Sequence, residues 1–345
     1  MTQHRLPLVS VVVPVYNGEE FLREALDSIL AQTCQEWDLT IVNNCSTDRT
    51  LEIAEEYARK DSRVRIHNNR DFLPMMRNIN NAFRRISSQS KYCKMLLADD
   101  LLFPECIERM VAVAEAHPSV GIVGAYGLAG HRLLWEGLPF PSTVVDGRQL
   151  SRATLQGGPY IFGSATSLLF RGDLVRSRDP FYDESNSHGD YHACLELLRS
   201  CDFGFVHQVL TYTRRRKESA TSFSRDFNTY LLEGLTALLQ YGAYFLNRFE
   251  QEECMRTWQR EYYTFLAKSA LCMREREFWD FHRNRLVELG HPLQRGKLLM
   301  AVLAEILYGI FHPKVSLTAV WVWWLRALKR RKQKVFDRRG AVLSG

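Results

Sequence analysis

The feature that most constrains the fold is a regular alternation of apolar runs and amphipathic segments over the first 125 residues. The run LVSVVVPV (8–15) is rich in β-branched residues and shows no polar alternation, which is typical of a parallel strand covered on both faces. Segment 19–32 follows it with apolar side chains at helical spacing. The same order recurs in strands at 38–42, 64–67, 92–98 and 121–125 and in helices at 50–60, 75–86 and 105–117. Strands that alternate with single helices predict an α/β fold with a doubly wound, mostly parallel sheet flanked by helices.

The pattern weakens in the second third of the chain and then becomes helical. Gly, Pro and Arg are frequent over 126–160, which indicates loops and a short antiparallel excursion. Segments 164–171 and 203–213 are predicted to be strands, and 191–200 between them a helix. Residues 226–289 have helical spacing with many aromatic side chains. The sequence therefore predicts a C-terminal helical extension of the α/β part.

The net charge of +6 is concentrated near the C-terminus. Segment 326–339 has eight Lys and Arg against one Asp and carries +7, so the rest of the chain sums to about −1. A protein that reads duplex nucleic acid needs a basic face on its folded body. We therefore expect no nucleic-acid partner.

The cysteines and the N-terminus favour a cytoplasmic protein. Eight cysteines are scattered without a CxxC pair or the spacing of zinc ligands. A disulfide framework is unusual in a chain of this length, so we expect reduced thiols. The first apolar run ends in Pro14-Val15-Tyr16-Asn17 and lacks the small-residue cleavage site of a secretory signal.

Two apolar runs near the C-terminus, 298–311 and 315–328, suggest contact with a membrane surface. As helices they would each span about 21 Å, which is short of the roughly 30 Å of a bilayer core. Three tryptophans (321, 323 and 324) precede the basic cluster, as in helices that lie in the interface. We expect a peripheral protein on the inner face of the cell membrane. Alternatively, 298–311 packs on the rest of the protein or in a dimer interface.

Three polar clusters follow predicted strands, where ligands gather in open α/β sheets: 14–19, 43–48 and Asp99-Asp100. Adjacent carboxylates repel each other unless a cation or donor compensates them. A hard divalent ion commonly bridges such carboxylates to substrate phosphates. The alternative for the Asp pair is a cap of the following helix, because Pro104 and Glu105 come soon after. Segment 43–48 has the same alternative.

The strings VSVVVPVYNGEEFLREALDSILAQT, VNNCSTDRT and LLADDLLFPECIERM resemble the family 2 glycosyltransferases of the GT-A fold. The resemblance covers residues 8–125 continuously and resumes more thinly around 164–222. It implies a nucleotide pocket lined by Pro14, Tyr16 and Glu19, with Asn43 and Asp48 near the base and ribose. Further residues are implied by matching motifs: Arg77 lies close to the donor, Asp99 contacts its sugar portion, and Asp100 is the direct ligand of Mn²⁺ or Mg²⁺.

The later string FYDESNSHGDYHACLELL (181–198) resembles the family's acceptor side, where Asp190 would be the general base. Its carboxylate would take the proton from the acceptor hydroxyl. Alternatively, Asp190 caps the helix that begins at Tyr191. Arg214, Arg215 and Arg216 are placed to meet a diphosphate, or form a solvated run.

Three positions depart from the commonest family pattern. Asn43 stands where Asp is usual, Leu97 where the acidic motif often begins with Asp, and Gly189 where Glu usually precedes the base. Asn43 can hydrogen-bond a nucleobase but supplies no charge. The departures bear on the identity of the donor more than on the reaction.

The resemblance implies a metal-dependent glycosyltransferase that moves a sugar from a nucleotide diphosphate to a hydroxyl of a saccharide or lipid-linked acceptor. We expect inversion at the anomeric carbon and a role in assembling cell-surface polysaccharide or glycolipid. The domains would be a GT-A catalytic domain over 1–222 (nucleotide-sugar half 1–125, acceptor half 126–222), a helical extension over 223–295, and membrane-associating helices with the basic tail over 296–345.

Two other functions remain open at this point. The departures are compatible with an inactive nucleotide-sugar-binding module that serves as an assembly partner at the membrane. A nucleotidyltransferase also uses an α/β sheet and a metal. It needs a Gly-rich, basic phosphate loop near the first strand, and PVYNGEEF lacks that composition.

Overall fold

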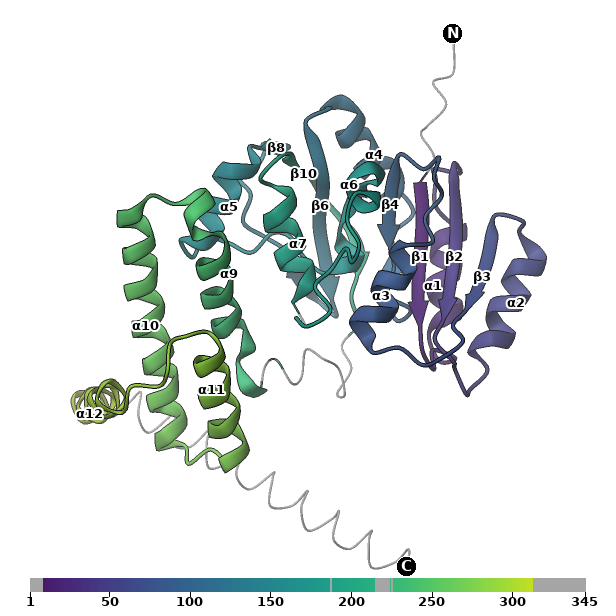
Figure 1. Ribbon diagram of the computed structural model, residues 1–345. Helices are drawn as coiled ribbons and strands as arrows, with labels where there is room; N and C mark the ends of the chain where they lie inside the picture. Colours follow the sequence, from purple (N-terminus) through teal and green to yellow (C-terminus); the bar gives the residue numbers. More distant parts are fainter. Residues whose placement is uncertain (1–8, 187, 215–223, 225, 313–345) are drawn as a thin grey trace, which may run out of the picture. The chain divides into compact units, whose positions relative to one another are not determined.

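The computed structural model describes residues 9–186, 188–214, 224 and 226–312 (Figure 1). The chain divides into two compact units. The first comprises Met1–Asp226 and Ala237–Cys254, and the second comprises Phe227–Thr236 and Met255–Gly345. Each unit is described by itself. The predicted domain limits at 222 and 295 stay predictions.

The first unit is built on one mixed sheet with the order β3-β2-β1-β4-β9-β6-β10-β5. Its strands are β1 (Val9–Val15), β2 (Trp37–Asn43), β3 (Val64–Asn68), β4 (Tyr92–Met95), β5 (Leu101–Leu102), β6 (Val120–Ala129), β7 (Arg132–Leu134), β8 (Val144–Val145), β9 (Leu169–Arg171) and β10 (Asp202–Tyr212). The strands β3, β2, β1 and β4 are parallel, and so are β6 and β10. The short β9 is antiparallel to both β4 and β6 and joins the two blocks. Both blocks therefore direct their carboxyl ends to the same edge of the sheet.

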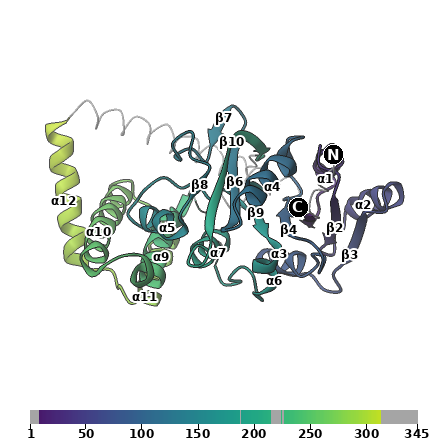
Figure 2. The same cartoon turned by 90° about the horizontal axis from the view of Figure 1, so that it is seen from above.

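Helices cover both faces of the sheet, as Figure 2 shows. The helices of the first unit are α1 (Leu22–Leu30), α2 (Thr50–Lys60), α3 (Met75–Phe83), α4 (Cys106–Ala116), α5 (Gly147–Leu155), α6 (Gly172–Arg176) and α7 (Gly189–Leu197). Along β1, Val9, Val11, Val13 and Val15 pack with α1, α2 and α4, whereas Val12 packs with the cluster that includes α3 and α7. This alternation follows from the two-residue period of a strand. The predicted doubly wound α/β fold is confirmed.

Two stretches differ from the sequence prediction. Residues 164–171 were expected to be one strand, but Ala165–Ser167 form a 3₁₀ turn (η1) and only Leu169–Arg171 pair in the sheet. The buried Lys94 ammonium donates to the carbonyl oxygens of Thr166 and Leu168, so those carbonyls are satisfied without a ladder. Within 126–160, the helix α5 was not expected. Its cap is Asp146, whose carboxylate accepts from the Gln149 backbone N–H at 2.8 Å.

The second unit is helical and has an aromatic core. It contains parts of α9 (Thr229–Phe245) and α10 (Arg248–Leu271), together with α11 (Arg276–Glu288) and α12 (Arg295–Phe311). Trp258 and Tyr262 stack with centroids 4.8 Å apart, and Phe278 and Leu286 pack with them. In the part of the chain that the structure describes, no helix has both the length and the apolarity that a membrane span requires.

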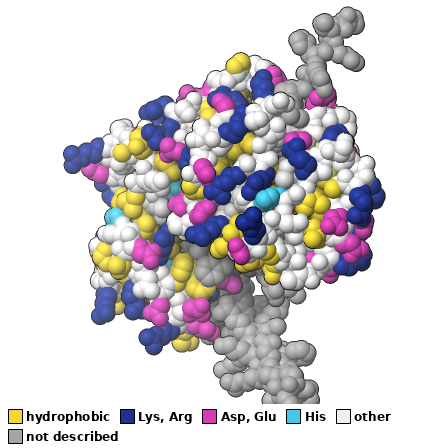
Figure 3. Space-filling view, turned by 45° about the vertical axis from the view of Figure 1, so that its right-hand side comes forward, with side chains coloured by type: hydrophobic (Ala, Val, Ile, Leu, Met, Phe, Trp, Pro, Cys, Tyr) yellow, Lys and Arg dark blue, Asp and Glu magenta, His cyan; other side chains and the backbone are white. Residues whose placement is uncertain are grey.

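The surface carries charges of both signs. On the face drawn in Figure 3, Lys and Arg side chains are intermixed with Asp and Glu, and apolar side chains lie between them. All eight cysteines have free thiols. The run 315–328 and the basic segment 326–339 lie outside the described residues.

Candidate functional site

The polar loops after β1 and β2 interlock at the carboxyl edge of the sheet. Glu19 contacts two successive residues of the second loop: its N–H donates to Asp48 Oδ2 at 3.1 Å, and its Oε2 accepts from the Arg49 N–H at 3.0 Å. Asp48 Oδ1 also accepts from the Thr50 N–H at the start of α2. The backbone of Asn17, in the left-handed region with φ +48°, donates to Ser46 Oγ. Asp48 therefore serves as a helix-end acceptor and as a link between the two loops.

Buried asparagine side chains form a hydrogen-bond network next to these loops. Asn43, at the end of β2, is buried, and its amide donates to Asn68 Oδ1 while its oxygen accepts from the Ser46 N–H. Asn44 pairs with both backbone groups of Leu73, accepting from its N–H at 2.9 Å and donating to its carbonyl at 2.8 Å. The Asn side chains thus stand in for backbone partners and fix the entry to α3. The Asn43 amide is engaged at both ends within the protein.

An exposed aromatic pair lies at the same edge. Pro14 is buried in β1, whereas Tyr16, two residues on, is about half exposed. Its ring contacts that of Phe72 edge-on, with centroids 4.9 Å apart, and Phe72 is more exposed still. Sequence reasoning missed Phe72, because the loop 69–74 has no periodic signal and its contact with Tyr16 is a tertiary one.

Asp99 and Asp100 end the apolar run that contains β4, and their surroundings differ. Asp100 is only 2 % exposed. Its Oδ2 accepts from Thr166 Oγ1 at 2.7 Å, and its Oδ1 accepts from the Arg214 N–H at 3.0 Å. Asp99 is half-buried, and its carbonyl oxygen accepts from Arg214 Nε at 3.0 Å. The strand β5 and residues 103–105 separate the pair from α4, so neither Asp caps that helix.

The burial of Asp100 has an electrostatic consequence. Desolvation raises the pKa of its carboxyl to about 7, and the neighbouring charge of Asp99 also raises it. Hydrogen bonds from Thr166 and Arg214 act in the opposite direction. Burial and the charge of Asp99 therefore both disfavour the ionised form of Asp100, which a nearby positive charge would stabilise.

A second buried ionisable group lies beneath this pair. Lys94, in β4, is fully buried, and burial lowers the pKa of its ammonium. Its Nζ donates to the Thr166 carbonyl at 2.6 Å, while the Thr166 hydroxyl donates to Asp100 and accepts from the Leu97 N–H. Lys94 thus anchors the residue that holds Asp100. The motif LLADD pointed to the acids but gave no sign of Thr166, which is 66 residues away.

The donor set fits a hard divalent cation. Two adjacent carboxylates at a strand end supply oxygen ligands, and Mg²⁺ or Mn²⁺ is commonly held by one or two carboxylates together with substrate phosphates. Burial and the charge of Asp99 both raise the pKa of Asp100, and a bound cation would oppose that rise. Among the described residues, no group of three or more His, Cys, Asp and Glu is placed to hold a metal by itself. Such an ion would therefore need ligands from the substrate.

Arg214 joins the far end of the sheet to the Asp pair. It follows β10, and besides Asp99 and Asp100 it pairs with Glu24 of α1 at 2.8 Å. Its guanidinium also lies over the Phe21 ring, 4.2 Å from the centroid. The predicted partners Arg215 and Arg216 lie outside the described residues.

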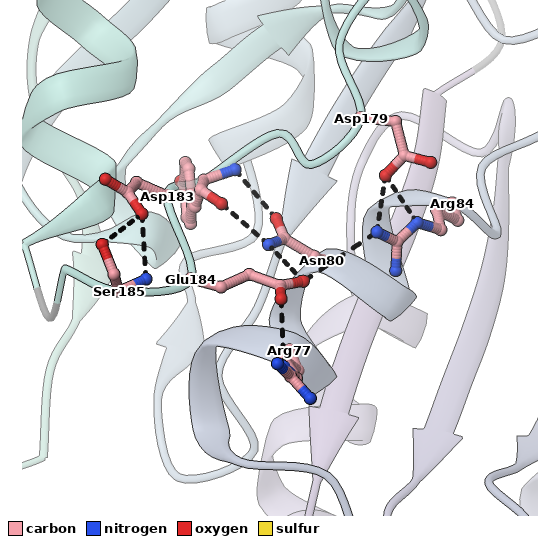
Figure 4. Close-up of polar contacts among 8 residues, drawn as sticks. Arg77, Asn80, Arg84, Asp179, Asp183, Glu184 and Ser185 are labelled. Carbon is pink, nitrogen blue, oxygen red and sulfur yellow. Dashed lines mark hydrogen bonds and ion pairs between the residues drawn. The ribbon is translucent and has the colours of Figure 1, made fainter.

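The remaining predicted residues, Arg77 and Asp190, belong to α3 and α7, and Figure 4 shows Arg77 with its partner Glu184. Arg77 is exposed on α3, and its Nε donates to Glu184 Oε2 at 3.0 Å. Asp190 is half-buried in the first turn of α7, one residue after Gly189, and its Oδ1 accepts from the Tyr191 N–H. The Tyr191 ring contacts that of Tyr160. Sequence reasoning did not identify Glu184 as the partner of Arg77, since the two are 107 residues apart.

The chain matches the family model described as "Glycosyl transferase family 2" over residues 10–165. It is 34% identical over 250 residues to an uncharacterized glycosyltransferase of Haemophilus influenzae, which covers 66% of this chain and 75% of that protein. It is 31% identical over 157 residues to the putative glycosyltransferase EpsE of Bacillus subtilis, which covers 43% of this chain and 55% of that protein. The aligned part thus spans about half the length of EpsE.

Solved structures share the fold. The S. aureus TarS fragment 1-349 in complex with UDP-GlcNAc has a TM-score of 0.61 at 18% identity, covering 81% of this chain and 80% of that chain. The mannosyltransferase PcManGT from Pyrobaculum calidifontis in complex with GDP-Man and Mn²⁺ has a TM-score of 0.52 at 13% identity, covering 92% and 84%.

Proposed function

The chain belongs to glycosyl transferase family 2, and from that premise we propose that it moves a sugar from a nucleotide-diphosphate donor to an acceptor hydroxyl. The observation that carries the proposal is the Asp99–Asp100 pair in the turn between β4 and β5, in contact with Arg214, which follows β10. Acids and a guanidinium at one sheet edge suit a cation-bound diphosphate.

We assign the donor to the carboxyl edge formed by the loops after β1, β2 and β4. The exposed rings of Tyr16 and Phe72 offer an apolar surface for a nucleobase. Pro14, Asn43 and Asp48 act through the shape of the loops, because their side chains are buried or engaged in holding the two loops together. Glu19 shares that role. The UDP-GlcNAc and GDP-Man held by the two structural neighbours support a nucleotide-sugar donor of this general kind.

We further propose that Asp99 and Asp100 hold Mn²⁺ or Mg²⁺. A bound divalent ion would offset the charge that develops on the departing diphosphate. In this assignment, the Arg214 backbone N–H orients the Asp100 carboxylate, and the Arg214 guanidinium holds the backbone carbonyl of Asp99. Asp99 is the more accessible of the two carboxylates. We assign Asp100 as the direct ligand and Asp99 as the sugar contact, and the variants Asp99→Asn and Asp100→Asn test which carboxylate binds the cation.

Asp190 is the proposed general base. Its carboxylate takes the proton from the acceptor hydroxyl as that oxygen attacks the anomeric carbon and the bond to the diphosphate breaks. One direct displacement inverts the configuration at that carbon. Arg77, exposed on α3, is assigned to the donor side of the same reaction.

The decisive measurement is transfer from a panel of UDP-, GDP- and dTDP-sugars to saccharide acceptors, with Mn²⁺ and with EDTA. We expect cation-dependent transfer by the wild-type chain and a loss of at least about 10³-fold in kcat for Asp190→Asn. Donor binding by calorimetry should survive that substitution. An inactive binding module would instead bind a nucleotide sugar without releasing nucleotide, and such a result would overturn the enzymatic proposal.

We also propose that α12 rests on a membrane surface and brings the enzyme to lipid-linked acceptors of cell-surface glycan assembly. None of its residues is buried, and eight apolar side chains are exposed on it: Leu299, Met300, Leu303, Ile306, Leu307, Tyr308, Ile310 and Phe311. Helical spacing puts most of them on one stripe, as in helices that lie in the interface. Vesicle flotation of the full chain and of a chain lacking 296–345 tests this proposal. Equal recovery of both from anionic vesicles would refute it.

A further inference from the structure

Helix α3 connects the donor side of the sheet edge to the segment that precedes Asp190. At its start, Asn44 holds Leu73 by two hydrogen bonds. On another side of the helix, Asn80 holds Tyr182 in the same way: its Oδ1 accepts from the Tyr182 N–H at 2.8 Å, and its Nδ2 donates to the Tyr182 carbonyl at 2.8 Å. Helix α3 is therefore fixed by two side-chain amides, each of which bonds both the N–H and the carbonyl of one backbone residue.

The Asn80 contact is enclosed. Asn80 is 1 % exposed and Tyr182 also 1 %, and water cannot replace either bond. A buried backbone N–H or carbonyl that loses its partner bears the full cost of desolvation. The backbone of Tyr182 therefore has one strongly preferred position relative to α3.

Two ion pairs on the exposed side of α3 reinforce this contact (Figure 4). Arg84 Nε donates to Asp179 Oδ1 at 2.7 Å, and Arg77 Nε donates to Glu184 Oε2 at 3.0 Å. The amide of Asn80 also reaches Glu184 Oε1 at 3.4 Å. Segment 179–184 is thus attached to α3 at both ends and in the middle.

The attachment continues to the helix that carries Asp190. The Asn186 N–H donates to the Asp183 carbonyl, and Asn186 Oδ1 accepts from the His188 N–H at 2.8 Å, just before α7. Gly189, the first residue of α7, fits closely against the same parts. A Cβ placed on it would lie 2.7 Å from Met76 Cε and 3.0 Å from Tyr182 Cβ. The glycine that departs from the family pattern therefore lets Met76 and Tyr182 pack closely against the start of α7.

We propose that Asn80 is a positioning residue for the acceptor-side chemistry: its paired hydrogen bonds to Tyr182 fix segment 179–186 and, through Gly189, the place of Asp190. Glu184 has a supporting part, because it ties the same segment to Arg77 on the donor side. The inference rests on the proposed function, since it concerns the base of that reaction. It adds a physical link between the donor and acceptor sides, carried by α3.

The test is steady-state kinetics of Asn80→Ala and Glu184→Gln together with donor affinity by calorimetry. We expect Asn80→Ala to lower kcat by roughly 10- to 100-fold, because a displacement of a catalytic group by about 1 Å has effects of that order. Donor Kd should stay within about twofold of wild type, since the loops after β1 and β2 are untouched. Glu184→Gln should lower kcat by a smaller factor, about threefold, because the Asn80 bonds remain.

The matched control is Glu250→Gln, which breaks the ion pair of Glu250 with Arg152 elsewhere in the first unit. It should leave kcat and donor Kd unchanged. Thermal melts show whether each variant is folded at the temperature of the assay. If Asn80→Ala does not fold, the kcat of Glu184→Gln is compared with that of Glu250→Gln instead. Wild-type kcat in Asn80→Ala, or in Glu184→Gln where that variant decides, would overturn the inference. So would an equal loss of kcat and donor affinity, which a general structural defect produces. If the wild-type chain transfers no sugar, the proposed function fails instead.

Discussion

Strand β1 and helix α12 come from apolar runs of similar appearance, and their surroundings are opposite. All seven residues of β1 are buried, whereas none of the residues of α12 is. β1 pairs with a strand on each side and is covered on both faces by helices of its own unit. α12 belongs to the second unit, which it touches through a few contacts such as Lys297 with Gln259 and Leu298 with the aromatic core. An apolar run predicts that its side chains avoid water, but it does not predict which part of the molecule or which partner covers them.

The two units of the chain differ in the surfaces that they present. The first unit buries its apolar strands and presents polar groups at one sheet edge, which is where the proposed chemistry lies. The second unit buries an aromatic core, and within its described part the apolar stripe of α12 is exposed. Changes at the sheet edge should therefore affect turnover, while changes on α12 should affect only where the protein resides.

The largest effect is expected for the Asp pair. Asp99→Asn and Asp100→Asn should each lower kcat by about 10³-fold, because the proposed cation then loses a charged ligand. The affinity for Mn²⁺ in the presence of nucleotide, measured by calorimetry, decides which residue is the direct ligand: that variant should lose more affinity. Near wild-type turnover in either variant would show that the role assigned to that acid is wrong.

The next effect concerns His282, buried in the core of the second unit. Burial lowers the pKa of its imidazole from 6.5 to about 4. In the unfolded chain the His282 imidazole binds a proton near pH 6.5, whereas in the folded unit it does so only near pH 4. The free energy of unfolding therefore falls as the pH is lowered from 6.5 to 4. The loss should amount to about 3 kcal/mol from this residue.

The variant His282→Phe should reduce this pH dependence, because a phenyl ring of similar size does not titrate. The measurement is the melting temperature of the two full-length proteins at several pH values between 4 and 7. Parallel curves for wild type and variant would contradict the assignment. A flatter curve for the variant would place the acid sensitivity in the second unit rather than at the sheet edge.

A smaller effect is expected for Thr166, whose carbonyl accepts from Lys94 while its hydroxyl donates to Asp100. Thr166→Val keeps the shape and removes the hydroxyl, leaving Asp100 Oδ2 and the Leu97 N–H without this partner. The free energy of unfolding should fall by about 2 kcal/mol, with a parallel loss of turnover. Chemical denaturation measures the first and transfer assays the second. Thr166→Ser is the control, since it keeps the hydroxyl and should retain most of both.

The smallest effect is expected on α12. Leu303→Glu should weaken binding to anionic vesicles by about tenfold, because it replaces an apolar contact with a charge. Transfer to a soluble acceptor should be unchanged. The control is Val287→Glu, which changes an exposed apolar residue of α11 outside the stripe. Equal effects of the two variants would mean that the stripe has no special role, and the contrast with β1 would then need a protein partner to explain it.

Much of the fold could be predicted from the sequence because its signals are local. The two-residue period of strands and the 3.6-residue period of helices are properties of neighbouring side chains, so the elements from β1 to α4 were located within a few residues, except the two-residue β5, which was not predicted. Segment 165–167 was not, because Lys94, which is 72 residues from Thr166, satisfies the carbonyls of Thr166 and Leu168 in place of a strand.

The sequence by itself determined the α/β architecture, the family and the presence of polar clusters after the predicted strands, since each depends on residues adjacent in the chain. Only the tertiary structure decided that Asp100 is buried between Thr166 and Arg214 while Asp99 stays accessible, and that Asn80 holds Tyr182. It also decided that, among the described residues, none of those on α12 is buried. The physical reason is the same in each case: burial and pairing depend on groups brought together from distant parts of the chain, and those encounters leave no pattern in the local sequence.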